Sequence, residues 1–193
     1  HSKPVVQINY NKNRISSPQG IGGDDRCGVI GIMHILNRGY RPHILFTDLE
    51  EVGGIGARDF AKSEITPDLN FILELDRKGR GEAVYYNCDN TEFEDFISDF
   101  GFKTEYGSFS DISIICPELG VAGVNLSAGY YNAHMLNEYV ILDDLQYTVD
   151  NVCDILEDCD TYFEYVECEY AYGGYESELP TLVDCIDVCW AVG

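Results

Sequence analysis

Carboxylate and imidazole side chains recur in this sequence at points where a folded chain could gather them around a metal ion. They are Asp24 and Asp25 in GIGGDDRCG, Glu50 and Glu51 in FTDLEEVGG, Asp76 in ELDRKG, and His134 in LSAGYYNAH. Carboxylate oxygen and imidazole nitrogen are ligands that zinc takes in hydrolytic sites, where one position stays open for water. The residue types therefore indicate a metal centre.

Each of these residues also has a simpler explanation when it is taken alone. Asp24 or Asp25 could cap the helix that follows. Asp76 could pair with Arg77 on the surface, where such a pair stabilises little. The two glutamates could be a solvated loop pair, and His134 could be an ordinary histidine. A helix cap does not explain why acidic residues end several successive strands, so the metal centre accounts better for the set.

Apolar periodicity and turn residues predict alternating strands and helices. Helices are predicted over 27–40, 55–63, 91–101 and 142–159, buried or half-buried strands over 43–47, 70–76 and 82–87, and strands leading into loops over 111–120 and 121–129. Thr91, with Glu94 three residues later, is typical of a capping box at a helix start. The alternation favours an α/β domain with a mostly parallel sheet.

The candidate site lies at one predicted edge of that sheet. In open α/β sheets, ligands bind beyond the carboxyl ends of the strands. Glu50 and Glu51 follow the predicted strand 43–47, and Asp76 ends the predicted strand 70–76. Because adjacent side chains diverge, one glutamate of the pair can bind a metal while its neighbour accepts a proton from water.

The net charge limits the classes of partner. The chain has 193 residues, with 34 acidic against 12 basic side chains and a formal net charge of −22. This charge repels phosphate backbones and anionic lipid, so we expect neither nucleic acid nor a membrane surface as a partner. We also identify no signal peptide and no apolar run of membrane-spanning length.

Eight cysteines are present and none forms a CxxC pair; they stand at 27, 88, 116, 153, 159, 168, 185 and 189. The first three lie among apolar residues, which is typical of small buried thiols. This scatter favours reduced thiols in a cytoplasmic protein. The alternative is a secreted protein in which the last five cysteines form disulfides.

Four motifs together resemble the co-catalytic di-zinc exopeptidases, the clan of zinc aminopeptidases, carboxypeptidases and aminoacylases. They are GGDDRCG, FTDLEEVGGIGA, ELDRKG and LSAGYYNAH, in an order and spacing that cover roughly residues 18–160. The resemblance implies a three-layer α/β/α fold around a mixed, mostly parallel sheet, with the N-terminal elements missing. The short stretch between Asp76 and His134 is similar to that of the single-domain, lidless members.

The resemblance also implies roles for the motif residues. Asp24 would bridge two zinc ions, with a cis peptide bond to Asp25, which would support the ligands. Glu51 and His134 would bind one ion, and Asp76 would bind the other. Glu50 would be the general base, and the substrate pocket would be lined by Arg77, Ser110, Asp111 and Tyr130.

One family motif, His-x-Asp on an upstream strand, would supply a histidine ligand to the ion at Asp76. The sequence begins HSKPVV, with Lys3 where the aspartate would stand if His1 were the ligand. We expect the motif to lie a few residues before His1, and the alternative makes His1 itself the ligand. One bound ion, or none, is the corresponding alternative to two.

The function predicted is metal-dependent hydrolysis of a peptide or small amide, with removal of an N-terminal residue. The alternative is a catalytically impaired, hydrolase-derived structural or assembly protein that holds a structural cation such as calcium. A third possibility is a fragment whose parent is the enzyme. Residues 1–160 would form the catalytic domain. Residues 161–193, rich in Tyr, Cys and Glu, would pack on it or on a partner copy in a homo-oligomer.

Overall fold

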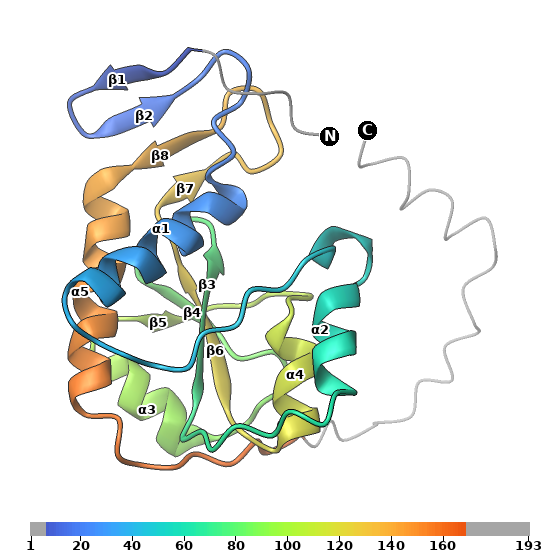
Figure 1. Cartoon of the computed structure of the whole chain (residues 1–193). Helices are drawn as coiled ribbons and strands as arrows, with labels where there is room; N and C mark the ends of the chain where they lie inside the picture. The colour runs from blue at the N-terminus through green and yellow to red at the C-terminus, as the bar shows by residue number, and fades with distance from the viewer. Residues whose placement is uncertain (1–6, 169–193) are drawn as a thin grey trace, which may run out of the picture.

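A four-stranded mixed sheet forms the centre of the computed structural model, which describes residues 7–168 (Figure 1). Its strands, in spatial order, are β3 (Ile72–Arg77), β6 (Gly123–Ser127), β4 (Glu82–Val84) and β5 (Lys103–Thr104). β3 runs parallel to β6 and β4 runs parallel to β5, whereas β4 and β6 are antiparallel. The predicted α/β class with a mixed central sheet is confirmed.

Helices cover both faces of this sheet. They are α1 (Gly23–Asn37), α2 (Ile55–Ala61), α3 (Thr91–Asp99), α4 (Ile112–Leu119) and α5 (Leu142–Glu157). α1 packs against α5 and β3 on one side, while α2 packs against α4 on the other (Figure 1). These layers place the start of α1 and the end of β3 at the same edge of the sheet.

The core between the layers is rich in aromatic side chains. Phe93 of α3 is fully buried, and its ring centroid lies 5.8 Å from that of Tyr85 and 5.1 Å from that of Phe163. Phe163 also donates its backbone N–H to Asn70. The described part of the C-terminal extension therefore packs on the domain, and residues 169–193 of that extension lie outside the described residues.

A second sheet, which the sequence did not predict, is antiparallel. Its strand order is β1 (Asn9–Asn11), β2 (Arg14–Ser16), β8 (Tyr139–Ile141) and β7 (Tyr130–Tyr131). The guanidinium of Arg14 lies 3.7 Å from the ring centroid of Tyr139, which fixes β2 to β8. The β7–β8 connection carries His134, so this sheet positions one of the candidate ligands.

Residues 111–120 were predicted as a strand leading into a loop, and this prediction is wrong because residues 112–119 form α4. The buried residues of α4 are Ile112, Ile115 and Cys116, which are spaced i, i+3, i+4 along one helix face. Burial of that face against the sheet outweighs the strand preference of an isoleucine-rich run.

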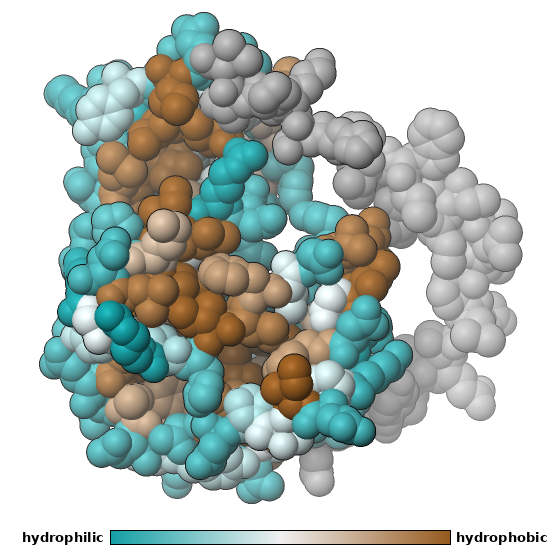
Figure 2. Space-filling view, in the orientation of Figure 1, coloured by the Kyte–Doolittle hydropathy of each residue, from teal (hydrophilic) through white to brown (hydrophobic). Residues whose placement is uncertain are grey.

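The predicted buried strand over 43–47 is also wrong. This segment forms no strand, and the side chains of Ile44, Leu45 and Phe46 are 39%, 43% and 59% exposed. None of the described strands pairs with it, so its backbone lacks the ladder that would make it a strand. Met33 on α1 is also exposed. Figure 2 shows that apolar side chains form an exposed apolar face on this side of the molecule.

Several element ends differ from the predictions. α1 begins at Gly23, four residues earlier than expected, and β4 ends at Val84 rather than at residue 87. The cap of α3 is Asn90 and not Thr91, because the Asn90 side chain accepts a hydrogen bond from the Phe93 N–H at 3.0 Å. The remaining predicted elements over 55–63, 70–76, 121–129 and 142–159 are confirmed as α2, β3, β6 and α5.

The cysteines predicted to be buried thiols are buried. Cys27, Cys88 and Cys116 are free and at most 4% exposed. Cys185 and Cys189 lie outside the described residues. Within residues 7–168, no helix is both long and apolar enough to cross a membrane.

Candidate metal centre

Asp24 lies at the start of α1, where the helix packs very closely on β3. A Cβ atom added at Gly28 would lie only 2.2 Å from the backbone oxygen of Leu75. This approach brings the first turn of α1 beside Asp76, the next residue of β3. The peptide bond between Asp24 and Asp25 is cis, as the resemblance implied.

One group of possible ligands contains Asp24, Glu51 and His134. The Nε2 atom of His134 lies 3.4 Å from Asp24 Oδ2 and 3.1 Å from Glu51 Oε1. One ligand atom from each of the three residues lies within 4.8 Å of the others. Three sequence motifs, far apart along the chain, therefore meet at one point.

A second group contains Asp24, Asp25 and Asp76, which also place one oxygen each within 4.8 Å of one another. Asp24 belongs to both groups. The Oδ1 atom of Asp76 is buried and has no hydrogen-bond partner among the described residues. Buried carboxylate oxygens are normally paired or bound to a cation, so the donor set fits a divalent ion.

The electrostatics of the cluster also fit a cation. Burial, followed by repulsion from Asp24, Asp25 and Glu50, raises the pKa of Asp76 to about 7. Burial likewise raises the pKa of Asp24 to about 7, although His134 opposes the rise. Ionised carboxylates crowded in this way repel one another, and a bound cation would reverse that repulsion.

Glu50 lies beside these groups on a short 3-10 helix, Glu50–Val52. The N–H groups of Gly53 and Gly54 both donate to the Glu50 backbone oxygen at 2.9 Å. The two glycines have φ values of 98° and 64°, which L side chains rarely adopt. The glycines after the glutamate pair thus form the turn that presents it. Burial, and then the charge of Glu51, raises the pKa of Glu50.

The residues predicted to line a substrate pocket have varied surroundings. Arg77 forms an ion pair with Glu82 at 2.8 Å rather than with Asp76. Ser110 and Tyr130 are 2% and 4% exposed, and Ser110 donates to Glu74. Asp111 is also buried and accepts a hydrogen bond from the Thr47 hydroxyl. Their part in substrate binding stays a prediction.

Asn125 is a supporting residue that the sequence analysis missed. It is 1% exposed, and its side-chain amide accepts from the Asp76 N–H and donates to the Asp76 carbonyl oxygen, each at 3.0 Å. The same amide group contacts Tyr86 and Ser110 at 3.2 and 3.1 Å. Its only sequence signal is a polar residue inside the apolar run GVNLS.

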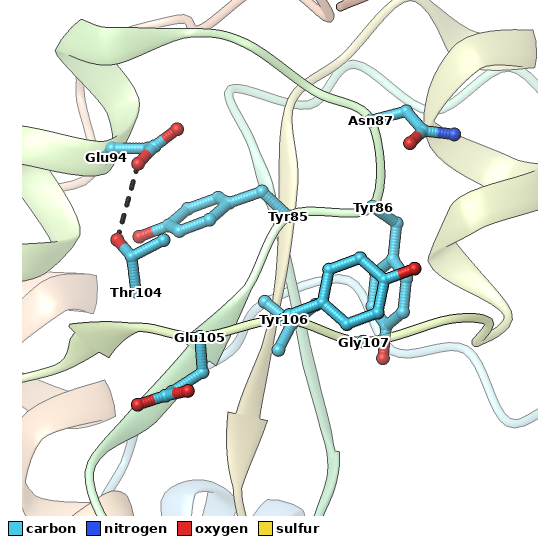
Figure 3. A pocket seen from close by; sticks show the side chains of 9 residues that line it. Tyr85, Tyr86, Asn87, Glu94, Thr104, Glu105, Tyr106 and Gly107 are labelled. Atoms are coloured by element: carbon cyan, nitrogen blue, oxygen red, sulfur yellow. Dashed lines mark hydrogen bonds between the residues drawn. The ribbon is translucent and has the colours of Figure 1, made fainter. Parts of the chain in front are cut away.

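A small hollow of about 150 Å³ lies elsewhere on the molecule (Figure 3). It is lined by Val84, Tyr85, Tyr86, Asn87, Glu94, Thr104, Glu105, Tyr106 and Gly107. Within it, the Thr104 hydroxyl donates to Glu94 at 3.3 Å. None of the clustered carboxylates or His134 contributes to this lining, so the hollow is separate from the candidate metal centre.

No family model and no curated protein sequence matches this chain. Solved structures do match. An aminopeptidase from the archaeon Desulfurococcus kamchatkensis, APDkam598, is 22% identical over 79% of this chain and 51% of its own, with a TM-score of 0.62. The aminopeptidase PepT from Bacillus cereus is 16% identical over 79% of this chain and 76% of its own, with a TM-score of 0.61.

A third match, PhTET1-12s, a dodecamer, is 20% identical over 77% of this chain and 53% of its own, with a TM-score of 0.55. The chain shares its fold with these three proteins, two of which are aminopeptidases. It spans about half the length of the first and third of them. The predicted resemblance to exopeptidases is therefore confirmed at the level of the fold.

Proposed function

We propose that this chain is a metal-dependent hydrolase of peptide or related amide bonds, acting as an aminopeptidase-like exopeptidase. The observation that carries the proposal is that Asp24 belongs to both groups of possible ligands. A carboxylate shared between two ligand groups suits a two-metal site, in which one residue bridges the ions. The fold shared with aminopeptidases supports the same reaction class.

In this proposal, Asp24 would hold both ions, Glu51 and His134 would hold one of them, and Asp76 would hold the other. Zinc bound there would polarise the scissile carbonyl and acidify a water molecule. Glu50 would accept the proton of that water and return it to the leaving amine. The raised pKa of Glu50 suits this exchange, because a general base works best when its pKa approaches the working pH.

The test is a Glu50→Gln variant assayed on alanine p-nitroanilide in the presence of zinc or cobalt. Glutamine keeps the shape of the side chain but cannot accept the proton. We expect kcat to fall by about 100-fold or more, with metal binding unchanged. The matched control is Glu64→Gln, which changes an exposed glutamate outside the cluster. Wild-type protein that binds metal but cleaves neither this substrate nor unblocked peptides would refute the proposal.

A second candidate is the hydrolase-derived assembly protein, and the exposed apolar face favours it. Ile44, Leu45 and Phe46 present apolar side chains that a second copy of the chain could bury. We expect such a protein to be a dimer or larger by light scattering, and Phe46→Asp to make it monomeric. Metal binding without hydrolysis, combined with this loss of assembly, would favour the second candidate over the first.

A further inference from the structure

Glu138 is a buried carboxylate that belongs to neither ligand group, and both of its oxygens accept hydrogen bonds from the start of α1. The side chain is part of a residue only 3% exposed. Its Oε2 accepts from the Gly22 N–H at 2.7 Å, and its Oε1 accepts from the Asp24 N–H at 3.1 Å. The carboxylate therefore contacts the backbone on both sides of Gly23.

These two hydrogen bonds replace a local helix cap. The cap position of α1 is Gly22, in the left-handed conformation, and it has no side chain that could accept from the helix N–H groups. The first N–H groups of a helix need acceptors, and its N-terminus favours a negative charge. Glu138 meets both needs from a distant part of the chain.

The start of α1 is also closely packed around Gly23, the residue between these two hydrogen bonds. A Cβ atom at Gly23 would lie 2.8 Å from the Cβ of Tyr130 and 2.9 Å from a methyl carbon of Val140. Tyr130 and Val140 are cross-strand partners in β7 and β8. The start of α1 thus rests directly on the hairpin whose connecting loop carries Glu138.

That loop also carries His134. The Glu138 N–H donates to the Met135 oxygen at 3.0 Å, which closes a turn immediately after His134. Glu138 consequently joins the loop of one candidate ligand to the helix start of another. Across this junction, the Nε2 atom of His134 lies 3.4 Å from the Oδ2 atom of Asp24.

We infer that Glu138 is a positioning residue that holds Asp24 and His134 at the separation a metal ion requires. The inference rests on the proposed metal-dependent function. Residues that hold metal ligands in place commonly change metal affinity by about 10- to 100-fold when they are replaced. Glu138 would act in this way without touching the ion.

The experiment compares Glu138→Gln with wild type and with Glu118→Gln, which changes an exposed glutamate on α4. Glutamine keeps the shape of the side chain, but its NH2 group cannot accept a hydrogen bond, so either the Gly22 N–H or the Asp24 N–H loses its acceptor. Zinc affinity is measured at 25 °C by competition with a colorimetric chelator. We expect about 10-fold weaker binding or more for Glu138→Gln, and no change for Glu118→Gln.

Hydrogen exchange of the metal-free proteins gives a second readout. The Gly22 and Asp24 amides should exchange about 10-fold faster in Glu138→Gln, while the core amides of β6 keep their protection. Glu138→Asp, whose side chain is one methylene shorter, should have a zinc affinity and amide exchange rates between those of wild type and Glu138→Gln. It replaces Glu138→Gln in the comparison if that variant folds poorly.

The outcomes that would overturn only this inference differ from the outcome that would also refute the proposed function. Zinc affinity that is equal in wild type and Glu138→Gln would overturn the inference and leave the proposed function standing. Loss of global stability with unchanged affinity would likewise overturn it, because the role would then be structural only. A wild-type chain that binds no zinc would refute the proposed function and the inference with it.

Discussion

Replacing Asn125 with alanine should destabilise the protein strongly, because Asn125 serves the backbone of a candidate ligand. The variant leaves the Asp76 N–H buried without its acceptor, at a cost of about 2 kcal/mol. Loss of the hydrogen bond to the Asp76 carbonyl oxygen and of the contacts with Tyr86 and Ser110 adds about 1–2 kcal/mol. The total is about 3–4 kcal/mol, or a fall in Tm of about 10 °C for a domain of this size.

The assay is thermal and urea unfolding of the metal-free protein, with Asn37→Ala as the control. Asn37 is exposed at the end of α1, so its replacement should change the free energy of unfolding by less than about 0.5 kcal/mol. Zinc affinity should fall in Asn125→Ala as well, since Asp76 would no longer be held. A loss of stability under about 1 kcal/mol would refute the reasoning, because it would mean that the buried amide is not needed.

Two further predictions concern helix packing and pH. Gly28→Ala should destabilise by more than about 2 kcal/mol, since the new Cβ would lie 2.2 Å from the Leu75 oxygen. In Gly31→Ala the new Cβ would lie 3.3 Å from a flexible Leu75 methyl carbon, so the free energy of unfolding, measured with urea, should fall far less. Equal losses in the two variants would contradict the close packing of α1 on β3 at Gly28. Asp24 and Asp76 have folded pKa values raised to about 7, from ordinary values of 3.8, so the folded state binds their protons more tightly. The metal-free protein should therefore lose stability as pH rises from about 4 to about 7, and zinc affinity should rise over the upper part of that range because binding releases protons. Unfolding and zinc titrations at a series of pH values test this, and flat profiles would contradict it.

Local motifs allowed much of the site to be predicted from the sequence. The glycine-rich stretch at Asp24 and the pair at Glu50 and Glu51 are short signals, and the glycines after the pair form the turn that the structure requires. The structure brings Glu51 and His134 to Asp24, and Asp76 to the same carboxylate. Apolar periodicity was sufficient for α5, whose buried residues recur at helical spacing, and a short apolar run was sufficient for β3.

Other features depend on contacts between distant residues, which local patterns do not contain. The bond from Asp24 to Glu138 spans 114 residues, and Glu138 carries no local sign that it caps α1. α4 is helical because one face is buried, although its isoleucines favour a strand. The segment 43–47 has strand-like residues but no described partner strand, and pairing is not encoded within five residues.

The number of zinc ions bound per chain, in wild type and in single variants, tests the central claim most directly. Because Asp24 is shared between the two ligand groups, Asp24→Asn should lose both ions. His134→Ala and Asp76→Asn should each lose about one ion of the wild-type two, measured by elemental analysis after dialysis against zinc. If Asp24→Asn keeps the wild-type zinc content, Asp24 does not join two sites, and the account is contradicted.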